Sequence, residues 1–367
     1  MPRKVKLYHY QLPLDCAMIL RGQSLTVREG WLIELQESTE LQESAELQES
    51  TEQPNHSQQY KLGRGEIAPL PGFSKETATQ AKLQLENVIT SWLAQGVVDL
   101  STCYPSVAFG FSMALLELEN GLPQTIRCSH NHHHANSALL LAADHRLIKA
   151  KHAQLVTSTL CKLKIASQPS VAAACHDGDI ARYLLQTYSH LRLRLDANRR
   201  WSLAAAQAFA NQIPAEYRQR IDFIEEPCHT PSDCLQFSRL TGIAIAWDES
   251  LREIDKNTQE QGALPLISAS NSGVKAIVIK PMLTGTVGYC AKLIELAHQQ
   301  GLTAVISSSL ESSFGLSQLA RLAQLLTPET IPGLDTVNVF KQQLAEPWPN
   351  CTLPLTPLSQ LAVTNYQ

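Results

Sequence analysis

The chain has 367 residues, which is too long for one small domain and suits an α/β barrel of about 250 residues with an accessory domain. Its net charge is −4 and it has no concentrated basic patch, so we expect no nucleic acid partner. Its nine cysteines are scattered without a C-x-x-C pair, and neither a signal peptide nor a long apolar run is present, so we expect a cytoplasmic protein that does not bind membranes.

The first 104 residues predict a small α+β domain. Residues 5–10 and 30–35 have the composition of strands, and residues 60–67 are the expected partner strand. A loop rich in proline and glycine follows, and we expect Ser74 to cap a helix that runs to about residue 93. The proline-rich tail after residue 332 is expected to return to this domain, so the capping domain comprises 1–104 and 333–367.

A repeat of six residues interrupts this domain. Glu-Leu-Gln-Glu-Ser begins at Glu34 and recurs from Glu40 and Glu46. A period of six matches neither a heptad nor a strand, and one leucine per copy cannot build a core. We therefore expect residues 36–58 to form an expanded hairpin loop, with a short helical protrusion as the alternative.

Strands and helices alternate from residue 105 to 332, at about 30 residues per unit, which predicts a (β/α) barrel of eight units. After a buried helix at 106–116, the expected strands are 160–165, 191–198, 221–225, 242–247, 274–280 and 302–309. The expected helices are 177–190, one that Thr230 caps and Gly242 ends, 288–299 and 316–326.

Four histidines lie between His130 and His134 and offer nitrogen ligands for a transition metal. No cysteine or acid completes a ligand set at the usual spacing. We therefore favour a solvated connector over a metal site for this loop.

Three acids end consecutive predicted strands: Asp196, Glu225 and Asp248. Consecutive strands of a barrel end side by side on one rim, where barrel enzymes carry their active sites. Three carboxylates without histidine or cysteine suit Mg²⁺, and Mn²⁺ is also possible. The alternative is three acids that cap helices.

Three lysines accompany these acids. Lys162 and Lys164 lie two apart on one strand and so share a face, and Lys280 ends a strand on the far side of the acids. Burial, a second lysine and a bound cation would each lower a lysine pKa from about 10.4, which would make it a base at neutral pH. Opposed lysines beside a metal suit removal of a proton α to a carboxylate, and the alternative is a structural network of ion pairs.

The order K-x-K, D-x-N, E-[EQ]-P, D-E-S and K-P in this chain resembles the enolase superfamily. Further segments make the chain similar to its o-succinylbenzoate synthase family: 69–74, 195–198, 225–228, 246–253, 278–281 and 306–313. The resemblance covers most of the chain and excludes the repeat, the histidine loop and an insertion near 257–270. It implies an α/β fold, with a modified (β/α) barrel at 105–332 and the α+β capping domain.

The resemblance also implies an enzyme, a carbon–oxygen lyase of menaquinone biosynthesis. Its reaction would be the Mg²⁺-dependent syn-dehydration of 2-succinyl-6-hydroxy-2,4-cyclohexadiene-1-carboxylate to 2-succinylbenzoate. Asp196, Glu225 and Asp248 would bind Mg²⁺. Lys164 would remove the α-proton and return it to the departing hydroxide, and Lys280 would stabilise the anion from the opposite face.

Six further residues are implied to contact or orient the substrate, which is a small carboxylate. They are Lys162, Arg194, Ser307, Ser308, Ser309 and Arg21. Arg194 has a structural ion pair as its alternative role, and Arg21 would help the capping domain to close. Asn198 and Glu249 are expected behind the metal ligands.

Two alternatives remain open. One is an N-acylamino acid racemase or dipeptide epimerase of the same superfamily, which also uses two facing lysines. The other is a non-catalytic barrel that binds a metal, and idle buried lysines and acids argue against it because they are costly. A monomer is our default expectation.

Overall fold

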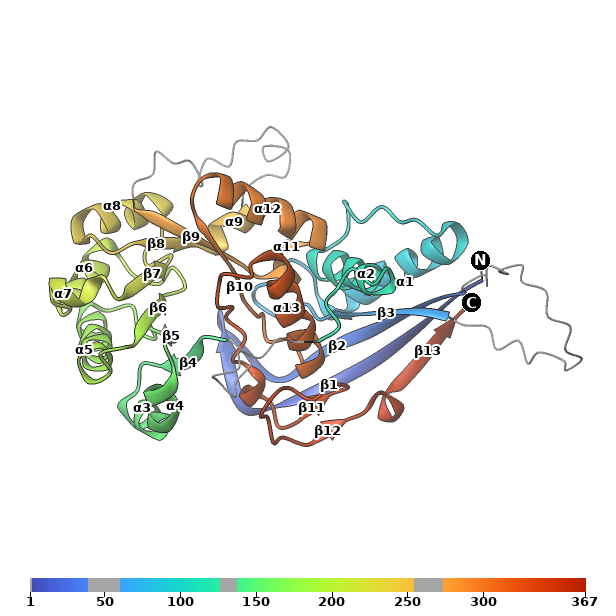
Figure 1. Ribbon diagram of the computed structural model, residues 1–367, viewed down its shortest axis with the longest axis horizontal. Helices are drawn as coiled ribbons and strands as arrows, with labels where there is room; N and C mark the ends of the chain where they lie inside the picture. Colours follow the sequence, from blue (N-terminus) through green and yellow to red (C-terminus); the bar gives the residue numbers. More distant parts are fainter. Residues whose placement is uncertain (1, 39–59, 126–136, 254–272) are drawn as a thin grey trace, which may run out of the picture.

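The computed structural model describes residues 2–38, 60–125, 137–253 and 273–367. These residues form a four-stranded antiparallel sheet beside a seven-stranded parallel sheet, with a small two-stranded sheet near the C-terminus. Figure 1 shows helices α5, α6, α8 and α12 on the outer side of the parallel strands. The expected α/β class, a barrel-like sheet with an α+β cap, is confirmed.

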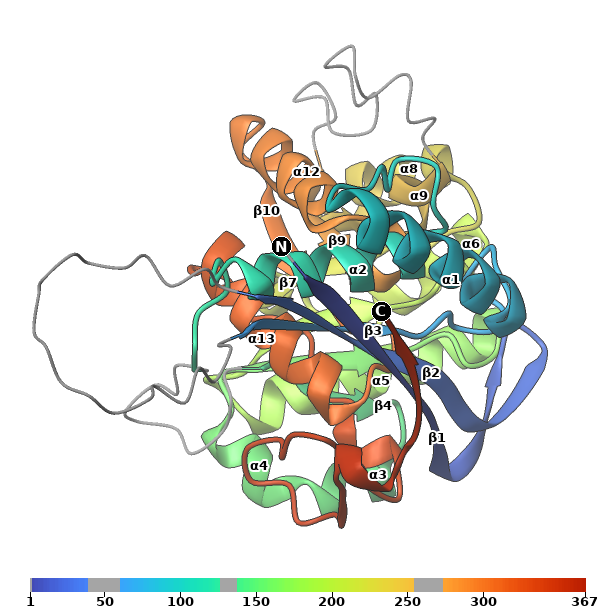
Figure 2. The same cartoon turned by 90° about the vertical axis from the view of Figure 1, so that its right-hand side faces the viewer.

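The antiparallel sheet has the order β13-β1-β2-β3. Its strands are β1 (Arg3–Leu20), β2 (Gln23–Ser38), β3 (Tyr60–Ile67) and β13 (Ala362–Tyr366). The turn between β1 and β2 uses Arg21 and Gly22, whose φ angles of 48° and 82° suit a tight hairpin. The pairing of β13 with β1 confirms that the tail returns to this sheet, and both termini lie close together in Figures 1 and 2.

The repeat begins inside a strand, which corrects the expected loop. Strand β2 continues to Ser38, where it pairs with Tyr60. Glu34 faces Arg64 across this pair, and their side chains form an ion pair of 2.8 Å. This cross-strand pairing holds the first copy of the repeat in the sheet. The remainder of the repeat, the histidine loop and the insertion at 257–270 lie outside the described residues.

Helices α1 (Ala78–Gln95) and α2 (Pro105–Leu118) pack together on one face of this sheet (Figure 2). Thr77 caps α1, because its side chain accepts from the Gln80 backbone N–H at 3.2 Å and the Gln80 side chain accepts from the Thr77 N–H at 2.9 Å. The expected cap was wrong: the Ser74 hydroxyl instead accepts from the Leu70 N–H.

The buried face of α2 belongs to the core of the antiparallel sheet. Val107, Ala108, Phe111, Ala114 and Leu118 pack in one cluster with β1, β2 and α1. The domain boundary predicted at residue 105 assigned this helix to the barrel. We propose that the capping domain extends through α2, since its apolar face completes that core.

Glycines let α2 approach β3 closely. A Cβ on Gly65 would lie 1.9 Å from the carbonyl oxygen of Gly110, so no side chain fits there. We expect Gly65→Ala to lower the free energy of unfolding by about 3 kcal/mol, because α2 must move away from the sheet. Gly288→Ala is the matched control, since nothing lies within 4 Å of its Cβ. Urea denaturation measures both, and equal stability of the two variants would contradict this packing.

The parallel sheet has the order β10-β9-β8-β7-β6-β5-β4. Its strands are β4 (Leu139–Ala142), β5 (Leu160–Lys164), β6 (Arg192–Asp196), β7 (Ile221–Glu225), β8 (Ile245–Trp247), β9 (Val274–Ile279) and β10 (Thr303–Ile306). The sequence did not predict β4. Eight units were expected, and the described residues form seven parallel strands.

A short segment takes the place of the eighth strand. The Gly333 N–H donates to the Ile306 carbonyl, and the Ala138 N–H donates to the Pro332 carbonyl, each at 2.9 Å. This segment therefore bridges β10 to the start of β4. No α-helix follows this segment in the described residues 333–367, so the alternation of strands and helices in the sequence ends near residue 332.

The helices of the barrel lie between its strands in sequence. They are α3 (His145–Ala150), α4 (His152–Thr157), α5 (Val171–Thr187), α6 (Leu203–Asn211), α7 (Ala215–Arg218), α8 (Pro231–Thr241), α9 (Glu249–Glu253), α11 (Pro281–Thr284), α12 (Val287–Gln299) and α13 (Ser313–Leu326). Helix α5 begins six residues earlier than expected, at Val171 rather than Asp177, because the Ser170 hydroxyl caps it. The caps expected for α8, Thr230 and Gly242, are confirmed.

The tail between α13 and β13 carries four short elements: η1 (Val337–Val339), β11 (Gln343–Leu344), β12 (Leu355–Thr356) and η2 (Leu358–Gln360). Among the described residues, no helix is both long and apolar enough to cross a membrane.

Candidate active site

A cavity of about 300 Å³ lies where the parallel strands end beneath the cap. Lys162, Lys164 and Lys280 all line it. Lys162 and Lys164 come from β5, and Lys280 follows β9, which lies four places away in the sheet. Two strands that lie far apart in the sheet therefore bring lysines to one cavity.

The three predicted acids lie behind these lysines. Asp196 is 0% exposed, and Glu225 and Asp248 are each 2% exposed. Parallel pairing aligns Asp196 with Lys164 on one side and with Glu225 on the other, and Asp248 follows β8 directly. Side chains at the ends of neighbouring strands meet at one rim, so the fold brings all three acids together.

Each acid holds a lysine. The Lys162 ammonium lies 2.9 Å from Asp196 Oδ2 and 2.7 Å from Glu225 Oε2. The Lys164 ammonium lies 2.5 Å from the same Asp196 oxygen, and its side chain is 42% exposed. The Lys280 ammonium contacts Asp248 Oδ2. Buried carboxylates are tolerated here because cations pair with them.

The electrostatics of the rim follow from this pairing. Burial alone raises the pKa of Asp196, but the lysines outweigh it and hold that pKa well below its ordinary value. Burial and the nearby Asp196 raise the pKa of Glu225 to about 7, against the opposing effect of Lys162. Burial raises the pKa of Asp248, whereas Lys280 and Arg252 lower it further than burial raises it. The site thus favours charge on Asp196 and Asp248.

Neighbouring carboxylates raise the pKa values of two of the lysines. Burial lowers the pKa of Lys162, but Asp196 and Glu225 raise it above the ordinary value. Burial likewise lowers the pKa of Lys280, and Asp248 more than compensates. At both lysines, direct pairing with carboxylates therefore raises the pKa by more than burial lowers it.

A further layer orders the acids. Glu226 accepts hydrogen bonds from the Asp248 N–H and the Ser250 N–H, each at 2.7 Å. Burial and Glu249 raise the pKa of Glu226 to about 7. The Asn198 N–H donates to Asp196 at 3.1 Å, and the Asn198 amide donates to Glu249 at 3.4 Å. Asn198 and Glu249 therefore lie beside the acids, as expected.

The carboxylate oxygens of Asp196, Glu225 and Asp248 are the kind of ligand that a divalent cation such as Mg²⁺ prefers. The Lys162 ammonium occupies a position between Asp196 and Glu225 oxygens, so these two carboxylates already hold one positive charge jointly. Among the described residues, no group of three or more His, Cys, Asp or Glu side chains is arranged closely enough to hold a metal ion. The assignment of a metal to these three acids therefore stays a prediction.

Ser307, Ser308 and Ser309 line the cavity beside Leu310. The Ser307 hydroxyl donates to the Gly333 carbonyl at 3.3 Å, and the Ser308 hydroxyl shares a hydrogen bond of 3.0 Å with Thr336. These contacts place the predicted serines at the cavity, whereas their role in binding substrate is a prediction.

Arg21 and Arg194 are not among the described residues that line the cavity. Arg21 is in the β1–β2 turn, 3.8 Å from Glu249 Oε1, with its guanidinium 4.5 Å from the centre of the Phe73 ring. Arg194 donates to the Ile331 carbonyl at 2.6 Å and lies 3.6 Å from Asp222. Arg194 lies outside the described lining of the cavity, so its contacts favour the alternative structural role.

The sequence missed several residues that line the cavity. Met18, Leu20, Leu70 and Phe73 are apolar side chains of the N-terminal part of the cap, Leu283 comes from α11, and Asp335 and Thr336 come from the segment after Pro332. The Asp335 carboxylate accepts a hydrogen bond of 2.9 Å from the N–H of Leu140, which lies in β4, the strand that the sequence did not predict. The run Pro-Gly-Leu-Asp at 332–335 was the available signal, since it ends the regular alternation.

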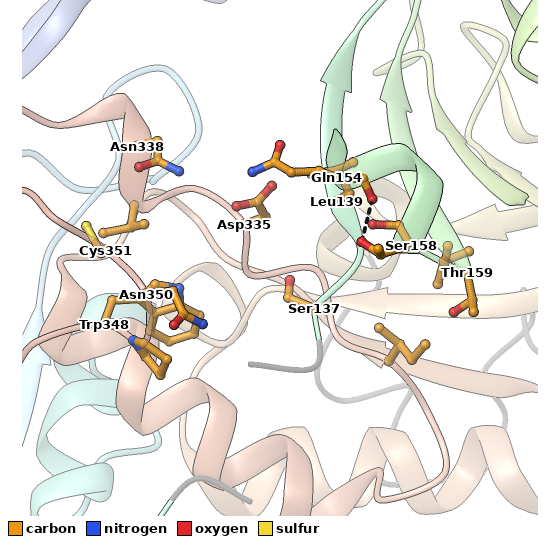
Figure 3. A pocket seen from close by; sticks show the side chains of 15 residues that line it. Ser137, Leu139, Gln154, Ser158, Thr159, Asp335, Asn338, Trp348, Asn350 and Cys351 are labelled. Carbon is orange, nitrogen blue, oxygen red and sulfur yellow. Dashed lines mark hydrogen bonds between the residues drawn. The ribbon is translucent and has the colours of Figure 1, made fainter. Parts of the chain in front are cut away.

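A second cavity of about 160 Å³ lies beyond Asp335 (Figure 3). Ser137, Gln154, Asn338 and Asn350 line it, and Asp335 is its one charged group among the described residues. The described lining of the second cavity includes no lysine, whereas three lysines line the first, which is therefore the candidate active site.

Comparison with known proteins agrees with this geometry. Residues 2–59 and 55–118 match the family model described as MenC, N-terminal domain, and residues 148–351 match the model of the enolase C-terminal domain-like family. The o-succinylbenzoate synthase of Aliivibrio salmonicida (strain LFI1238) is 44% identical over 361 residues, which cover 98% of each chain. The chain belongs to the o-succinylbenzoate synthase family. The o-succinylbenzoate synthase of Vibrio cholerae serotype O1 (strain ATCC 39315 / El Tor Inaba N16961) is 41% identical to this chain, over 98% of this chain and 97% of its own length.

O-succinylbenzoate synthases are lyases of the enolase superfamily, so the expected enzyme class is confirmed. Solved structures share the fold. The o-succinylbenzoate synthase of Thermosynechococcus elongatus BP-1 has a TM-score of 0.65 at 22% identity, covering 94% of this chain and 95% of that one. The N-succinyl Arg/Lys racemase of Bacillus cereus ATCC 14579 has a TM-score of 0.70 at 15% identity, covering 100% of both chains.

Proposed function

We propose that this member of the o-succinylbenzoate synthase family carries out the Mg²⁺-dependent syn-dehydration of 2-succinyl-6-hydroxy-2,4-cyclohexadiene-1-carboxylate to 2-succinylbenzoate in menaquinone biosynthesis. The observation that carries the proposal is the single cavity lined by Lys164 and Lys280 from separate strands, with three buried acids behind them. Family membership narrows the reaction to this dehydration, and the cavity offers both a base and a second cation for it.

Lys164 is the proposed base. Its neutral amine takes the proton from the ring carbon that bears the carboxylate, and the ammonium that forms then gives this proton to the hydroxide that leaves the neighbouring carbon. One side chain performs both transfers, so hydrogen and hydroxide leave from the same face and the ring becomes aromatic. Its side chain is 42% exposed, which leaves the amine free to reach from Asp196 into the cavity.

Lys280 and Lys162 supply positive charge on either side. Lys280 lines the wall away from Lys164, where its ammonium stabilises the developing anion and lies against the ring face. Lys162 lines the cavity next to Lys164 and faces the substrate carboxylate. Apolar side chains of the cap, including Leu20 and Phe73, exclude water from the ring.

Asp196, Glu225 and Asp248 would hold Mg²⁺, and Mn²⁺ suits the same oxygen donors. Bound Mg²⁺ would withdraw charge from the substrate carboxylate and so acidify the adjacent C–H bond. The support is the set of three buried carboxylates, and the Thermosynechococcus elongatus enzyme is described as complexed with Mg in its active site.

The assay is direct. Purified protein with Mg²⁺ should convert the cyclohexadiene acid to an aromatic product, followed by its ultraviolet absorbance. Chelation with EDTA should abolish turnover, and added Mg²⁺ or Mn²⁺ should restore it. Failure of the wild-type protein with Mg²⁺ to form the aromatic product would overturn the proposed reaction.

Racemisation of N-acylamino acids is the second candidate activity. The fold is shared with an N-succinyl Arg/Lys racemase, and lysines on two walls of a cavity suit proton transfer on either face. Polarimetry with N-succinyl-L-arginine tests this activity on the same preparation.

The cytoplasmic location and the monomeric state stay predictions. Gel filtration measures the oligomeric state.

A further inference from the structure

Arg28 is a buried arginine that joins the cap to the barrel. It lies on β2 and is 1% exposed. Its guanidinium donates to the Pro69 carbonyl at 2.5 Å and to the Ala68 carbonyl, both in the cap. It also donates to the Leu310 carbonyl at 3.0 Å and to the Ser309 carbonyl at 3.5 Å, both in the barrel. One side chain therefore fixes four backbone carbonyls across the boundary.

The barrel segment that Arg28 holds is part of the cavity wall. Ser309 and Leu310 line the cavity together with Ser307 and Ser308. Leu310 has a φ of 60°, a left-handed conformation that a leucine rarely adopts without outside support. The hydrogen bond from Arg28 to the Leu310 carbonyl supplies such support.

Ser309 has a hydroxyl to offer to a ligand. It is 3% exposed, and its Oγ is buried without a hydrogen-bond partner among the described residues. A buried hydroxyl without a partner is costly, and a polar group of a ligand in the cavity would satisfy it. The orientation of this hydroxyl depends on the backbone that Arg28 fixes.

A second contact from the cap fixes the far end of the same segment. Glu66 on β3 accepts from the Ser312 N–H at 3.0 Å and from the Ser312 hydroxyl at 2.8 Å. Ser312 caps α13, and the Tyr10 hydroxyl donates to the same Glu66. The segment from Ser307 to Ser312 is thus held at its end by Glu66 and in its middle by Arg28.

We propose that Arg28 is a positioning residue that sets substrate affinity by holding Ser309 and Leu310 against the cavity. The inference rests on the proposed dehydration. The proton-transfer groups lie on β5 and after β9, whereas Arg28 acts on the segment after β10. Loss of its hydrogen bonds therefore raises KM and leaves kcat nearly unchanged.

The test compares Arg28→Lys and Arg28→Met with the wild type in steady-state assays. Lysine keeps the charge but cannot reach four carbonyls with one planar group. Each variant should raise KM about tenfold, with kcat within about threefold. Arg321→Met is the matched control: Arg321 is 8% exposed and joins α13 to α2 through Glu117 at 3.1 Å, away from the cavity lining. It should lower the thermal midpoint and leave KM unchanged.

A double variant tests whether Arg28 acts through Ser309. Ser309→Ala should raise KM, and Arg28→Lys combined with Ser309→Ala should raise it by less than the product of the two single effects. Wild-type KM in folded Arg28→Met, an equal KM rise in Arg321→Met, or fully multiplicative effects would overturn the proposal. Unfolding of both Arg28 variants while Arg321→Met stays folded would also overturn it. A wild type without turnover contradicts the proposed dehydration instead.

Discussion

Lys164→Ala should lower kcat by about 10³-fold, the contribution expected of a general base. The fold should remain intact, because the Lys164 side chain is 42% exposed and Asp196 keeps its ion pair with Lys162 at 2.9 Å. Steady-state assays of the aromatic product measure the loss, and circular dichroism with thermal melting verifies the fold. Substrate should still bind, since Lys162, Lys280 and the serine wall are unchanged.

Lys6→Ala is the matched control for this variant. Lys6 also lies on a strand, is 40% exposed at its side chain and pairs with Glu34 at 3.3 Å, but it lies near the start of β1, whereas the cavity-lining Met18 and Leu20 lie at the end of that strand. It should retain wild-type kcat. Wild-type turnover by Lys164→Ala would assign the proton transfer to another group, and an equal loss in Lys6→Ala would show that a general loss of stability had been measured.

Lys280→Met should affect both turnover and stability. Turnover should fall by about 10³-fold, because the anion loses its stabilising charge on that wall of the cavity. The free energy of unfolding should fall by about 3 kcal/mol, because Asp248 stays buried with Arg252 at 3.7 Å as its remaining cation among the described residues. Added Mg²⁺ should recover part of this stability, since a ligand that binds the folded state stabilises it.

Lys275→Met tests the same strand at an exposed position. It should leave turnover and the urea midpoint as in the wild type. Unchanged stability of Lys280→Met would mean that water or another group already compensates Asp248. A stability loss that Mg²⁺ does not reduce would count against a cation site at Asp248.

The strands could be predicted well where local pattern and tertiary context agree. Strands β3 and β7 have the expected bounds, 60–67 and 221–225, and a proline follows two residues after the end of each strand, at Pro69 and Pro227. The start of α5 and the cap of α1 were missed. In both cases several hydroxyl residues stood near the end of the helix, and tertiary packing decided which one became the cap.

The acids and lysines of the site could be predicted because the carboxyl ends of parallel strands meet. Their pairing could not be predicted, because it depends on side-chain reach. Lys162 contacts both Asp196 and Glu225, and these contacts raise its pKa although burial lowers it. Arg194 shares a strand face with Asp196, yet its guanidinium extends to Ile331 in the segment that replaces the eighth strand. The cavity is also lined by residues of the cap and by residues after Pro332, which are distant in sequence from the barrel strands. Strand periodicity cannot predict such contacts.

The pairing of β13 with β1 has a consequence for biosynthesis. Residues near both ends of the chain, such as Val5 and Tyr366, are hydrogen-bonded neighbours in one sheet. Strand β1 precedes the barrel in the sequence and β13 follows it, so the outer edge of β1 waits without its partner while the barrel is synthesised. Unpaired strand edges are sites of aggregation. The nascent protein therefore carries this open edge during the whole synthesis of the barrel, and its cap sheet is completed only once β13 has also been made.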